Sequence, residues 1–123
     1  MDHKVLIVDD SHFIYDDMKR VLDGSEFVVA GYCTAGEDVL DTYESVRPDL
    51  VTMDIVLPGM DGLETSAQLL EAHPEARIII VSSLDYEETE DKAKALGVET
   101  FLFKPFEGEE LLQALRFAAG ELR

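Results

Sequence analysis

The sequence predicts a single α/β domain, a doubly wound parallel sheet of five strands with five helices. Short apolar runs, several of them β-branched, alternate with longer segments whose apolar residues recur at helical spacing. The first and fourth runs are apolar almost throughout, which is typical of strands covered on both faces of a parallel sheet. Parallel strands require right-handed crossovers, and 2-1-3-4-5 is the strand order that known five-stranded sheets of this class adopt.

The expected elements alternate regularly along the chain. The expected strands are Lys4–Val8, Phe27–Cys33, Leu50–Met53, Arg77–Val81 and Glu99–Phe103. Helical spacing marks the segments Phe13–Leu22, Val39–Val46, Leu63–Leu70, Ala93–Leu96 and Leu111–Ala118. Gly24 and Gly97 stand where helices should end, and Pro48 and Pro74 closely follow helical runs. The acidic run Asp85–Asp91 should open the fourth helix, because negative charge favours a helix N-terminus.

Length and composition indicate one domain, residues 1–123, in a reducing compartment. A chain of 123 residues, 46% of them hydrophobic, has the commonest domain size and can fill a core. Cys33 is the only cysteine, so no intrachain disulfide can form. No segment approaches the roughly 20 consecutive apolar residues that span a bilayer. We therefore expect a cytoplasmic protein.

The charge of the chain argues against two classes of partner. There are 27 acidic and 10 basic residues, which gives a formal net charge of −17. Such a field repels nucleic-acid phosphates and anionic membrane surfaces, because both are bound largely through Lys and Arg. We expect no direct nucleic-acid partner and no membrane insertion. Acidic surfaces also keep many proteins in solution, so the total charge alone identifies no partner.

Polar side chains follow four of the five expected strands. Asp9 and Asp10 come after the first strand and Asp54 after the third. Ser82 follows the fourth strand and Lys104 follows the fifth. In a doubly wound sheet, the ligand site lies beyond the carboxyl ends of the strands, near the switch point of the strand order. Three carboxylates, a hydroxyl and an ammonium group are therefore expected at one edge of the sheet.

This group of side chains suits a metal-assisted reaction of phosphate. Three ionised carboxylates at close quarters need a cation between them, and oxygen ligands with several waters suit Mg²⁺. A Mg²⁺ with open positions can bridge to a phosphoryl group, while Lys104 and Ser82 can contact its other oxygens. Asp54 is then a candidate carboxylate nucleophile that forms an acyl phosphate.

Each residue also has an ordinary structural interpretation. Asp10 with Ser11 can cap the following helix, and Asp54 can be a plain loop residue. Ser82 can belong to a turn, and Lys104 can be a solvated lysine before a proline that starts a helix. These interpretations do not predict functional groups at four strand ends at once. Their conjunction therefore favours a site.

Four motifs stand at these strand ends. They are Val8-Asp9-Asp10-Ser11, Met53-Asp54-Ile55 through Pro58-Gly59-Met60-Asp61-Gly62, Val81-Ser82-Ser83 and Phe103-Lys104-Pro105-Phe106. In their order and spacing, over essentially the whole chain, they resemble the motif set of bacterial response-regulator receiver domains, and chemotaxis-type receivers in particular. The resemblance implies a flavodoxin/CheY-like fold and a phosphorylation switch of two-component signalling, not an enzyme.

By that resemblance, Asp54 is the phosphoacceptor. Mg²⁺ is bound by Asp10, by Asp54 and by the backbone carbonyl of Val56. Asp9 acts mostly through water, and Lys104 contacts the phosphoryl group.

The resemblance also assigns the switch and the partners. Ser82 is the switch hydroxyl, and Phe101 stands where the family's switch aromatic turns inward on activation. Pro105 resembles the family's cis-peptide proline. The phosphoryl donor is a sensor histidine kinase or a small acyl phosphate. The output is a changed contact with a downstream protein through the fourth helix, fifth strand and fifth helix. The protein is expected to be a monomer, or a weak dimer on phosphorylation.

Three other interpretations stay open. A haloacid dehalogenase-like phosphatase also uses Asp, Mg²⁺, Ser or Thr and Lys, but its nucleophile follows the first strand, whereas Asp54 follows the third. A flavodoxin-like carrier would need a hydroxyl- and Gly-rich phosphate loop after the first strand, where this chain has Asp9 and Asp10. The chain can also be the receiver portion of a longer regulator with a DNA-binding or enzymatic output.

Four positions depart from the commonest receiver pattern. Ser83 stands where a small Ala is frequent, and Leu57 replaces a frequent Met. Val56 and Leu84 are both aliphatic, where many relatives carry a polar group on at least one side. A polar side chain there can orient the hydrolytic water, so we expect a long-lived phosphorylated form.

Overall fold

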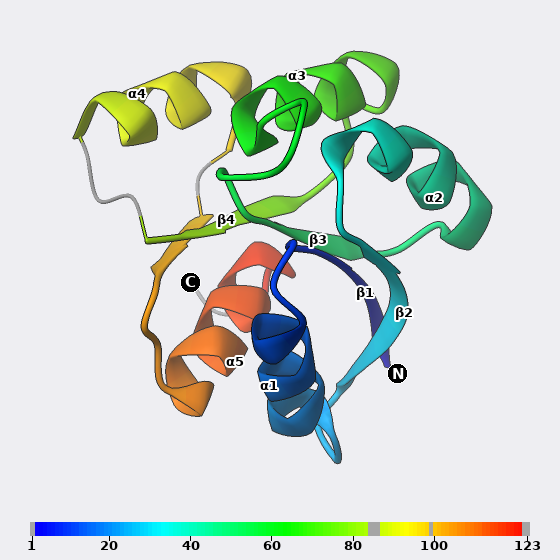
Figure 1. The fold of residues 1–123 in the computed structure, drawn as a ribbon. Coiled ribbons are helices and arrows are strands. Elements are labelled where there is room, and N and C mark those ends of the chain that lie inside the picture. The colour runs from blue at the N-terminus through cyan, green and yellow to red at the C-terminus, as the bar shows by residue number, and fades with distance from the viewer. Residues whose placement is uncertain (1, 84–86, 99, 122–123) are drawn as a thin grey trace.

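A computed structural model describes residues 2–83, 87–98 and 100–121 of the protein. At its centre lies a five-stranded parallel sheet with the order β2-β1-β3-β4-β5 (Figure 1). The strands are β1 (His3–Val8), β2 (Phe27–Cys33), β3 (Leu50–Met53), β4 (Ile78–Ser82) and β5 (Thr100–Phe103). The predicted fold class and strand order are confirmed.

The strand boundaries differ slightly from the sequence prediction. β1 begins one residue earlier, at His3, whose N–H donates to the carbonyl of Glu26 at 2.8 Å. β4 lies one residue further along the chain, because its ladder with β5 extends to the pair of Ser82 and Phe103. Ser82 is therefore the last residue of the strand. Glu99, predicted as a strand residue, lies outside the described residues.

Helices cover both faces of the sheet, as crossovers between parallel strands require. α1 (His12–Leu22) and α5 (Gly108–Ala118) lie on one face (Figure 1). α2 (Val39–Val46), α3 (Gly62–Ala72) and α4 (Glu87–Leu96) lie on the other, and a 3₁₀ turn η1 (Gly36–Asp38) precedes α2. Within the described part of the chain, none of these helices is long and apolar enough to cross a membrane.

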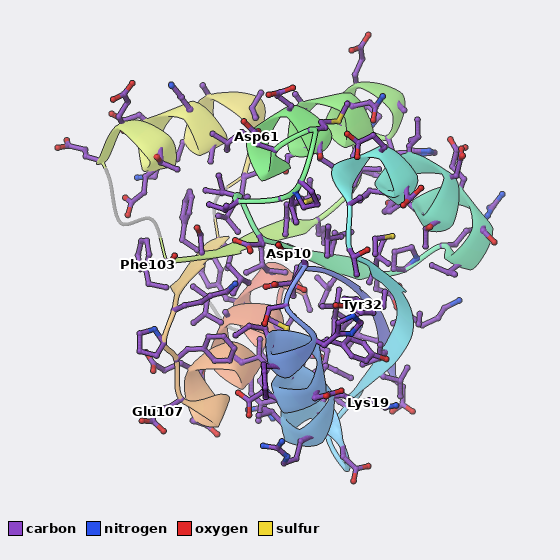
Figure 2. The ribbon with its side chains drawn as sticks, in the orientation of Figure 1. Asp10, Lys19, Tyr32, Asp61, Phe103 and Glu107 are labelled. Atoms are coloured by element: carbon purple, nitrogen blue, oxygen red, sulfur yellow. The ribbon has the colours of Figure 1, made fainter. Side chains whose placement is uncertain are left out.

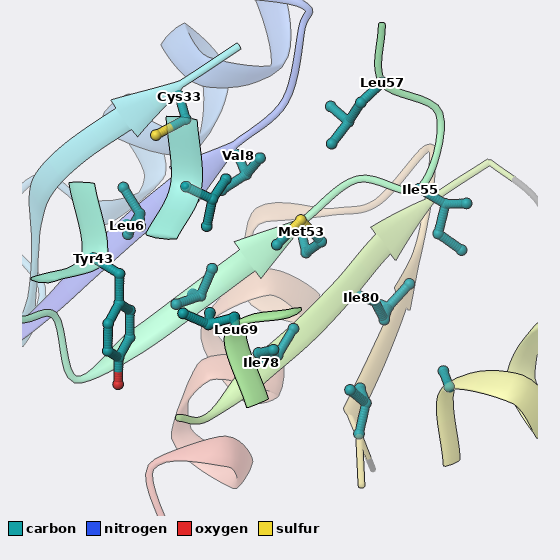
Figure 3. Packing of buried hydrophobic residues seen from close by; sticks show 14 residues of the cluster. Leu6, Val8, Cys33, Tyr43, Met53, Ile55, Leu57, Leu69, Ile78 and Ile80 are labelled. Carbon is teal, nitrogen blue, oxygen red and sulfur yellow. The ribbon is translucent and has the colours of Figure 1, made fainter. Parts of the chain in front are cut away.

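Alternate residues of β1 face the two helical layers. Val5 and Ile7 belong to the apolar cluster beneath α1 and α5. Leu6 and Val8 belong to the cluster on the opposite face, which Figure 3 shows. This alternation explains why the strand is apolar on both sides. Cys33 is buried in the second cluster, as expected for a small hydrophobe.

The ends of α1 and α4 follow local rules that the sequence indicated. Ser11 is the N-cap of α1, and its Oγ accepts a hydrogen bond from the Ile14 N–H at 3.4 Å. Gly24 and Gly97 follow α1 and α4 with φ values of 79° and 103°, in the region that favours glycine. Because Ser11 supplies the cap, the carboxylate of Asp10 is not needed to start the helix.

Candidate functional site

Three aspartates meet where β1 and β3 end. Val8 and Met53 are partners in the ladder, and the Asp54 N–H donates to the Val8 carbonyl at 2.9 Å. Asp9, Asp10 and Asp54 each place a carboxylate oxygen within 4.8 Å of the others. Asp9 and Asp54 are only 1% and 6% exposed, whereas Asp10 is exposed at the mouth of the site (Figure 2). The pocket thus has two buried acids and one acid facing solvent.

Lys104 places an ammonium group among these carboxylates. Its Nζ lies 2.7 Å from Asp9 Oδ2 and 3.3 Å from Asp54 Oδ2. Its backbone N–H donates to the Ser82 carbonyl at 2.9 Å, and the Lys104–Pro105 peptide bond is cis. The sequence indicated that this lysine belongs to the site. It did not indicate that its closer partner is Asp9.

Asp9 is held by three hydrogen bonds. Its Oδ1 accepts from the Ser11 N–H at 2.9 Å and its Oδ2 accepts from Lys104. Its own N–H donates to the Cys33 carbonyl at 3.1 Å. A buried carboxylate is tolerated when both oxygens are bonded in this way. The position of Asp9 is therefore fixed by the fold before any ligand binds.

The electrostatics of Asp54 are dominated by its burial. Burial raises the pKa of the Asp54 carboxyl above its ordinary value. The ammonium group of Lys104 opposes this rise in pKa, the charge of Asp9 adds to it, and a hydrogen bond from the Val56 N–H opposes it. The charged form of Asp54 therefore depends on positive neighbours, and a bound cation would favour it further.

The loop after β3 folds back tightly on Asp54. The Gly62 N–H donates to the Ile55 carbonyl at 2.8 Å. Gly62 is needed at this point, because a Cβ there would overlap the Asp54 carbonyl oxygen. Leu57 is buried, whereas the side chain of Val56 is 56% exposed. The loop thus carries an aliphatic side chain at the surface two residues after Asp54.

The ends of β4 and β5 carry the remaining predicted residues. Ser82 is 1% exposed at the end of β4. Phe101 is half-buried, pairs with Ile80 in the ladder and packs against the cluster shown in Figure 3. Ser83 is exposed, and Leu84 lies outside the described residues.

One contact at the edge of the site had no signal in the sequence. Glu37 in η1 reaches the loop after β3, where its Oε1 accepts a hydrogen bond from the Met60 N–H at 2.7 Å. Glu37 is one of 27 acidic residues and belongs to none of the four motifs. Its relation to the loop is visible only in the fold.

The donor set fits a hard divalent cation. In an octahedral Mg²⁺ site each Mg–O distance is about 2.0–2.1 Å, so adjacent ligand oxygens lie about 2.9 Å apart and opposite ones about 4.1 Å apart. The three carboxylate oxygens lie within 4.8 Å of one another, a limit that includes this spacing. An all-oxygen set with one side open to solvent leaves positions for water, as Mg²⁺ prefers.

Comparison with known proteins identifies the family. Residues 5–116 match the response regulator receiver domain family. The chain belongs to this family. The chemotaxis protein CheY of Listeria monocytogenes is 37% identical over 116 residues, which cover 94% of this chain and 98% of that protein. The nitrate/nitrite response regulator NarL of Escherichia coli is 35% identical over 120 residues, which cover 96% of this chain and 56% of that protein.

Solved structures agree with this assignment. A chain of the CheX–CheY–BeF₃–Mg²⁺ complex of Borrelia burgdorferi superposes with a TM-score of 0.89 at 30% identity. The match covers 94% of this receiver and 87% of that chain. The predicted resemblance to CheY-like receiver domains is therefore confirmed, together with an acidic cluster that can bind Mg²⁺.

Proposed function

We propose that this receiver, residues 1–123 as one domain, is a signalling switch that accepts a phosphoryl group on Asp54. The observation that carries the proposal is the convergence of Asp9, Asp10 and Asp54 around the ammonium group of Lys104. These residues follow three separate strands of the sheet. The family to which the chain belongs consists of signalling receiver domains. The reaction is self-catalysed phosphorylation and dephosphorylation, so the chain is a switch and not an enzyme acting on other molecules.

The transfer needs a nucleophile and a compensating charge. A carboxylate oxygen of Asp54 attacks the phosphorus of a kinase phosphohistidine or of a small acyl phosphate. An O–P bond forms as the donor's P–N or P–O bond breaks, and the electron pair of the broken bond leaves with the imidazole nitrogen or the acyl carboxylate. Asp10, Asp54 and the Val56 carbonyl would hold Mg²⁺, with Asp9 acting through water, and the ion would supply positive charge to neutralise the phosphoryl oxygens.

The chain's own residues then read the new group. Lys104, 3.3 Å from Asp54 Oδ2, turns its ammonium group to a phosphoryl oxygen. Ser82 donates its hydroxyl to another phosphoryl oxygen, and its movement gives Phe101 room to turn inward. This two-state change alters the face formed by α4, β5 and α5.

That face has the chemistry of a partner site. A cavity of about 560 Å³ lies between β5 and α5, lined by Phe101, Leu102, Phe117 and the acids Glu109 and Glu110 among others. Phe117 is 50% exposed. A downstream protein that inserts an apolar side chain and carries Lys or Arg beside it would match this combination. The net charge of −17 strengthens the preference for a basic partner.

Intact-mass analysis tests the proposal. After incubation with acetyl phosphate and Mg²⁺, the wild type should gain one labile phosphoryl group, and Asp54→Asn should gain none. Asp2→Asn removes an exposed acid outside the pocket and should be labelled like the wild type. Undiminished labelling of Asp54→Asn would show that another residue is the acceptor. Hydrogen exchange in α4, β5 and α5, with α2 as the internal reference, then tests the output face.

A second candidate concerns the length of the native regulator. The match to NarL covers only 56% of that protein. The alternative is therefore that this receiver is part of a longer regulator with an output domain. An immunoblot of source cells against this receiver distinguishes the two, because a longer regulator would give a larger band. A haloacid dehalogenase-like phosphatase is disfavoured, because Asp54 follows β3 and not β1.

We place the switch in the cytoplasm, as a monomer or as a weak dimer when phosphorylated, with a sensor histidine kinase as donor.

A further inference from the structure

Glu37 links two segments that flank the site. It lies in η1, between β2 and α2, and its Oε1 accepts a hydrogen bond from the Met60 N–H at 2.7 Å. Met60 belongs to the loop after β3, which also carries Asp54 and Val56. The side chain of Glu37 therefore spans from the segment after one strand to the loop after another, 23 residues further along the chain.

The approach of the two segments is close enough to be selective for glycine. Gly59 has a φ of 73°, and a Cβ at this residue would overlap the Glu37 carboxylate. Gly36 faces the same loop, because its Cβ would collide with Thr65 Oγ1 and lie 2.8 Å from the Met60 carbonyl oxygen. Glycines on both sides of the contact allow the backbone and the carboxylate to meet.

Other hydrogen bonds hold the base and the end of the same loop. At its base, Gly62 N–H bonds to the Ile55 carbonyl at 2.8 Å. At its end, Asp61 Oδ1 accepts from the Glu64 N–H at 2.8 Å and starts α3. Glu37 holds the tip of the loop at Gly59–Met60 through its hydrogen bond with the Met60 N–H. The same hydrogen bond favours the charged carboxylate and lowers the pKa of Glu37.

We propose that Glu37 is a positioning residue for the metal site. By holding the tip of the loop, it keeps the backbone of Val56 oriented toward the pocket where Asp10 and Asp54 meet. The inference rests on the proposed function only in taking the Val56 carbonyl as a ligand of Mg²⁺. Glu37 itself touches neither the ion nor the phosphoryl group. Its loss should therefore weaken metal binding and leave the reaction at saturating metal nearly unchanged.

Two substitutions at Glu37 separate its hydrogen bond from its charge. Glu37→Gln keeps an acceptor oxygen but loses the negative charge, whereas Glu37→Ala loses both. Asp41→Ala removes an exposed acid from α2 and controls for the long-range effect of charge. Mg²⁺ is titrated into each metal-free protein by calorimetry, and labelling by acetyl phosphate is measured at saturating Mg²⁺. Hydrogen exchange at the Met60 amide reports the tie directly.

We expect the Kd for Mg²⁺ to rise about fivefold in Glu37→Ala, the equivalent of one modest hydrogen bond. Glu37→Gln and Asp41→Ala should stay within about twofold of the wild type. Met60 should exchange faster in Glu37→Ala only. An unchanged Kd in Glu37→Ala, or equal weakening in Gln and Ala, would overturn the positioning role, as would a wild type that binds no Mg²⁺. A wild type that binds Mg²⁺ but leaves Asp54 unlabelled would overturn the proposed function and not this inference.

Discussion

In the metal-free protein, Asp54→Asn is expected to raise the free energy of unfolding at pH 7 by about 1–2 kcal/mol. Asp54 Oδ2 lies 3.3 Å from the Lys104 ammonium, and Asp54 has an oxygen within 4.8 Å of oxygens of Asp9 and Asp10. At an effective dielectric constant of about 20, the attraction between Asp54 and Lys104 amounts to ~5 kcal/mol. The repulsion of Asp54 by Asp9 and by Asp10 amounts to at least ~3.5 kcal/mol each. The charge of Asp54 is thus disfavoured by about 2 kcal/mol, and screening at the exposed Asp10 reduces this figure.

The substitution removes little else. Asn keeps the volume of Asp54 and an acceptor oxygen for the Val56 N–H, and Lys104 keeps its closer bond to Asp9 at 2.7 Å. The pH dependence gives a second check. Because the pKa of Asp54 is raised in the folded protein, its protonated form contributes stability that is complete below the ordinary pKa of about 3.9 and is lost as pH rises through the raised pKa. The advantage of Asn should therefore shrink as the pH falls from 7 toward about 4.

Urea unfolding in EDTA, followed by circular dichroism, measures the effect. With an m-value of about 1–2 kcal/mol per molar urea, the midpoint of Asp54→Asn should lie about 1 M above that of the wild type. Asp2→Asn serves as the charge control, because Asp2 is exposed and outside the pocket. Added Mg²⁺ should raise the midpoint of the wild type more than that of Asp54→Asn. A lower midpoint for Asp54→Asn in EDTA would refute the electrostatic reasoning.

Three further changes are expected to give measurable results. Asp10→Asn should abolish Mg²⁺-dependent labelling while leaving the metal-free melting temperature equal or higher, and a large drop in melting temperature would instead show a structural role. Val56→Asn with Leu84→Glu should speed loss of the phosphoryl group by roughly 10-fold after donor removal in excess Mg²⁺, and an unchanged decay rate would contradict the aliphatic barrier to water. The Arg116 guanidinium lowers the pKa of Glu26 from 4.5 to about 2, so their bond stabilises the fold above pH 4.5 and is lost between pH 4.5 and 2. Glu26→Gln should therefore lower the melting temperature at pH 7 but not at pH 2, and equal losses at both pH values would count against the ion pair.

Most of the fold could be predicted because the sequence patterns are local. Continuous apolar runs such as Lys4–Val8 identify buried strands, and Gly24 and Gly97 mark helix ends by the φ values that they adopt. The boundary of β4 was off by one residue. Its last residue, Ser82, is polar, so hydrophobicity ended one position before the ladder with Phe103 did.

The convergence of Asp9, Asp54 and Lys104 could be predicted, but the pairing of their charges could not. Position at strand ends brings Asp9, Asp54 and Lys104 to one edge, since all strands are parallel. Which carboxylate binds the ammonium more closely depends on side-chain geometry at distances of 2.7 and 3.3 Å, which no spacing in the sequence encodes. The Glu37–Met60 contact could not be predicted from the sequence for the same reason. It joins two segments whose approach depends on the packing of η1 against the loop after β3.

The ion pair between Lys104 and Asp9 affects the balance of charge in the proposed switch. One ammonium group shared by Asp9 and Asp54 cannot offset three carboxylates, so the metal-free pocket keeps an excess of negative charge. Mg²⁺ binding would relieve the excess, and a phosphoryl group would then compete with Asp9 for the ammonium of Lys104. In the proposed switch, Lys104 would leave Asp9 for the phosphoryl group, and the strength of its bond to Asp9 would set the energy that the phosphoryl group must exceed.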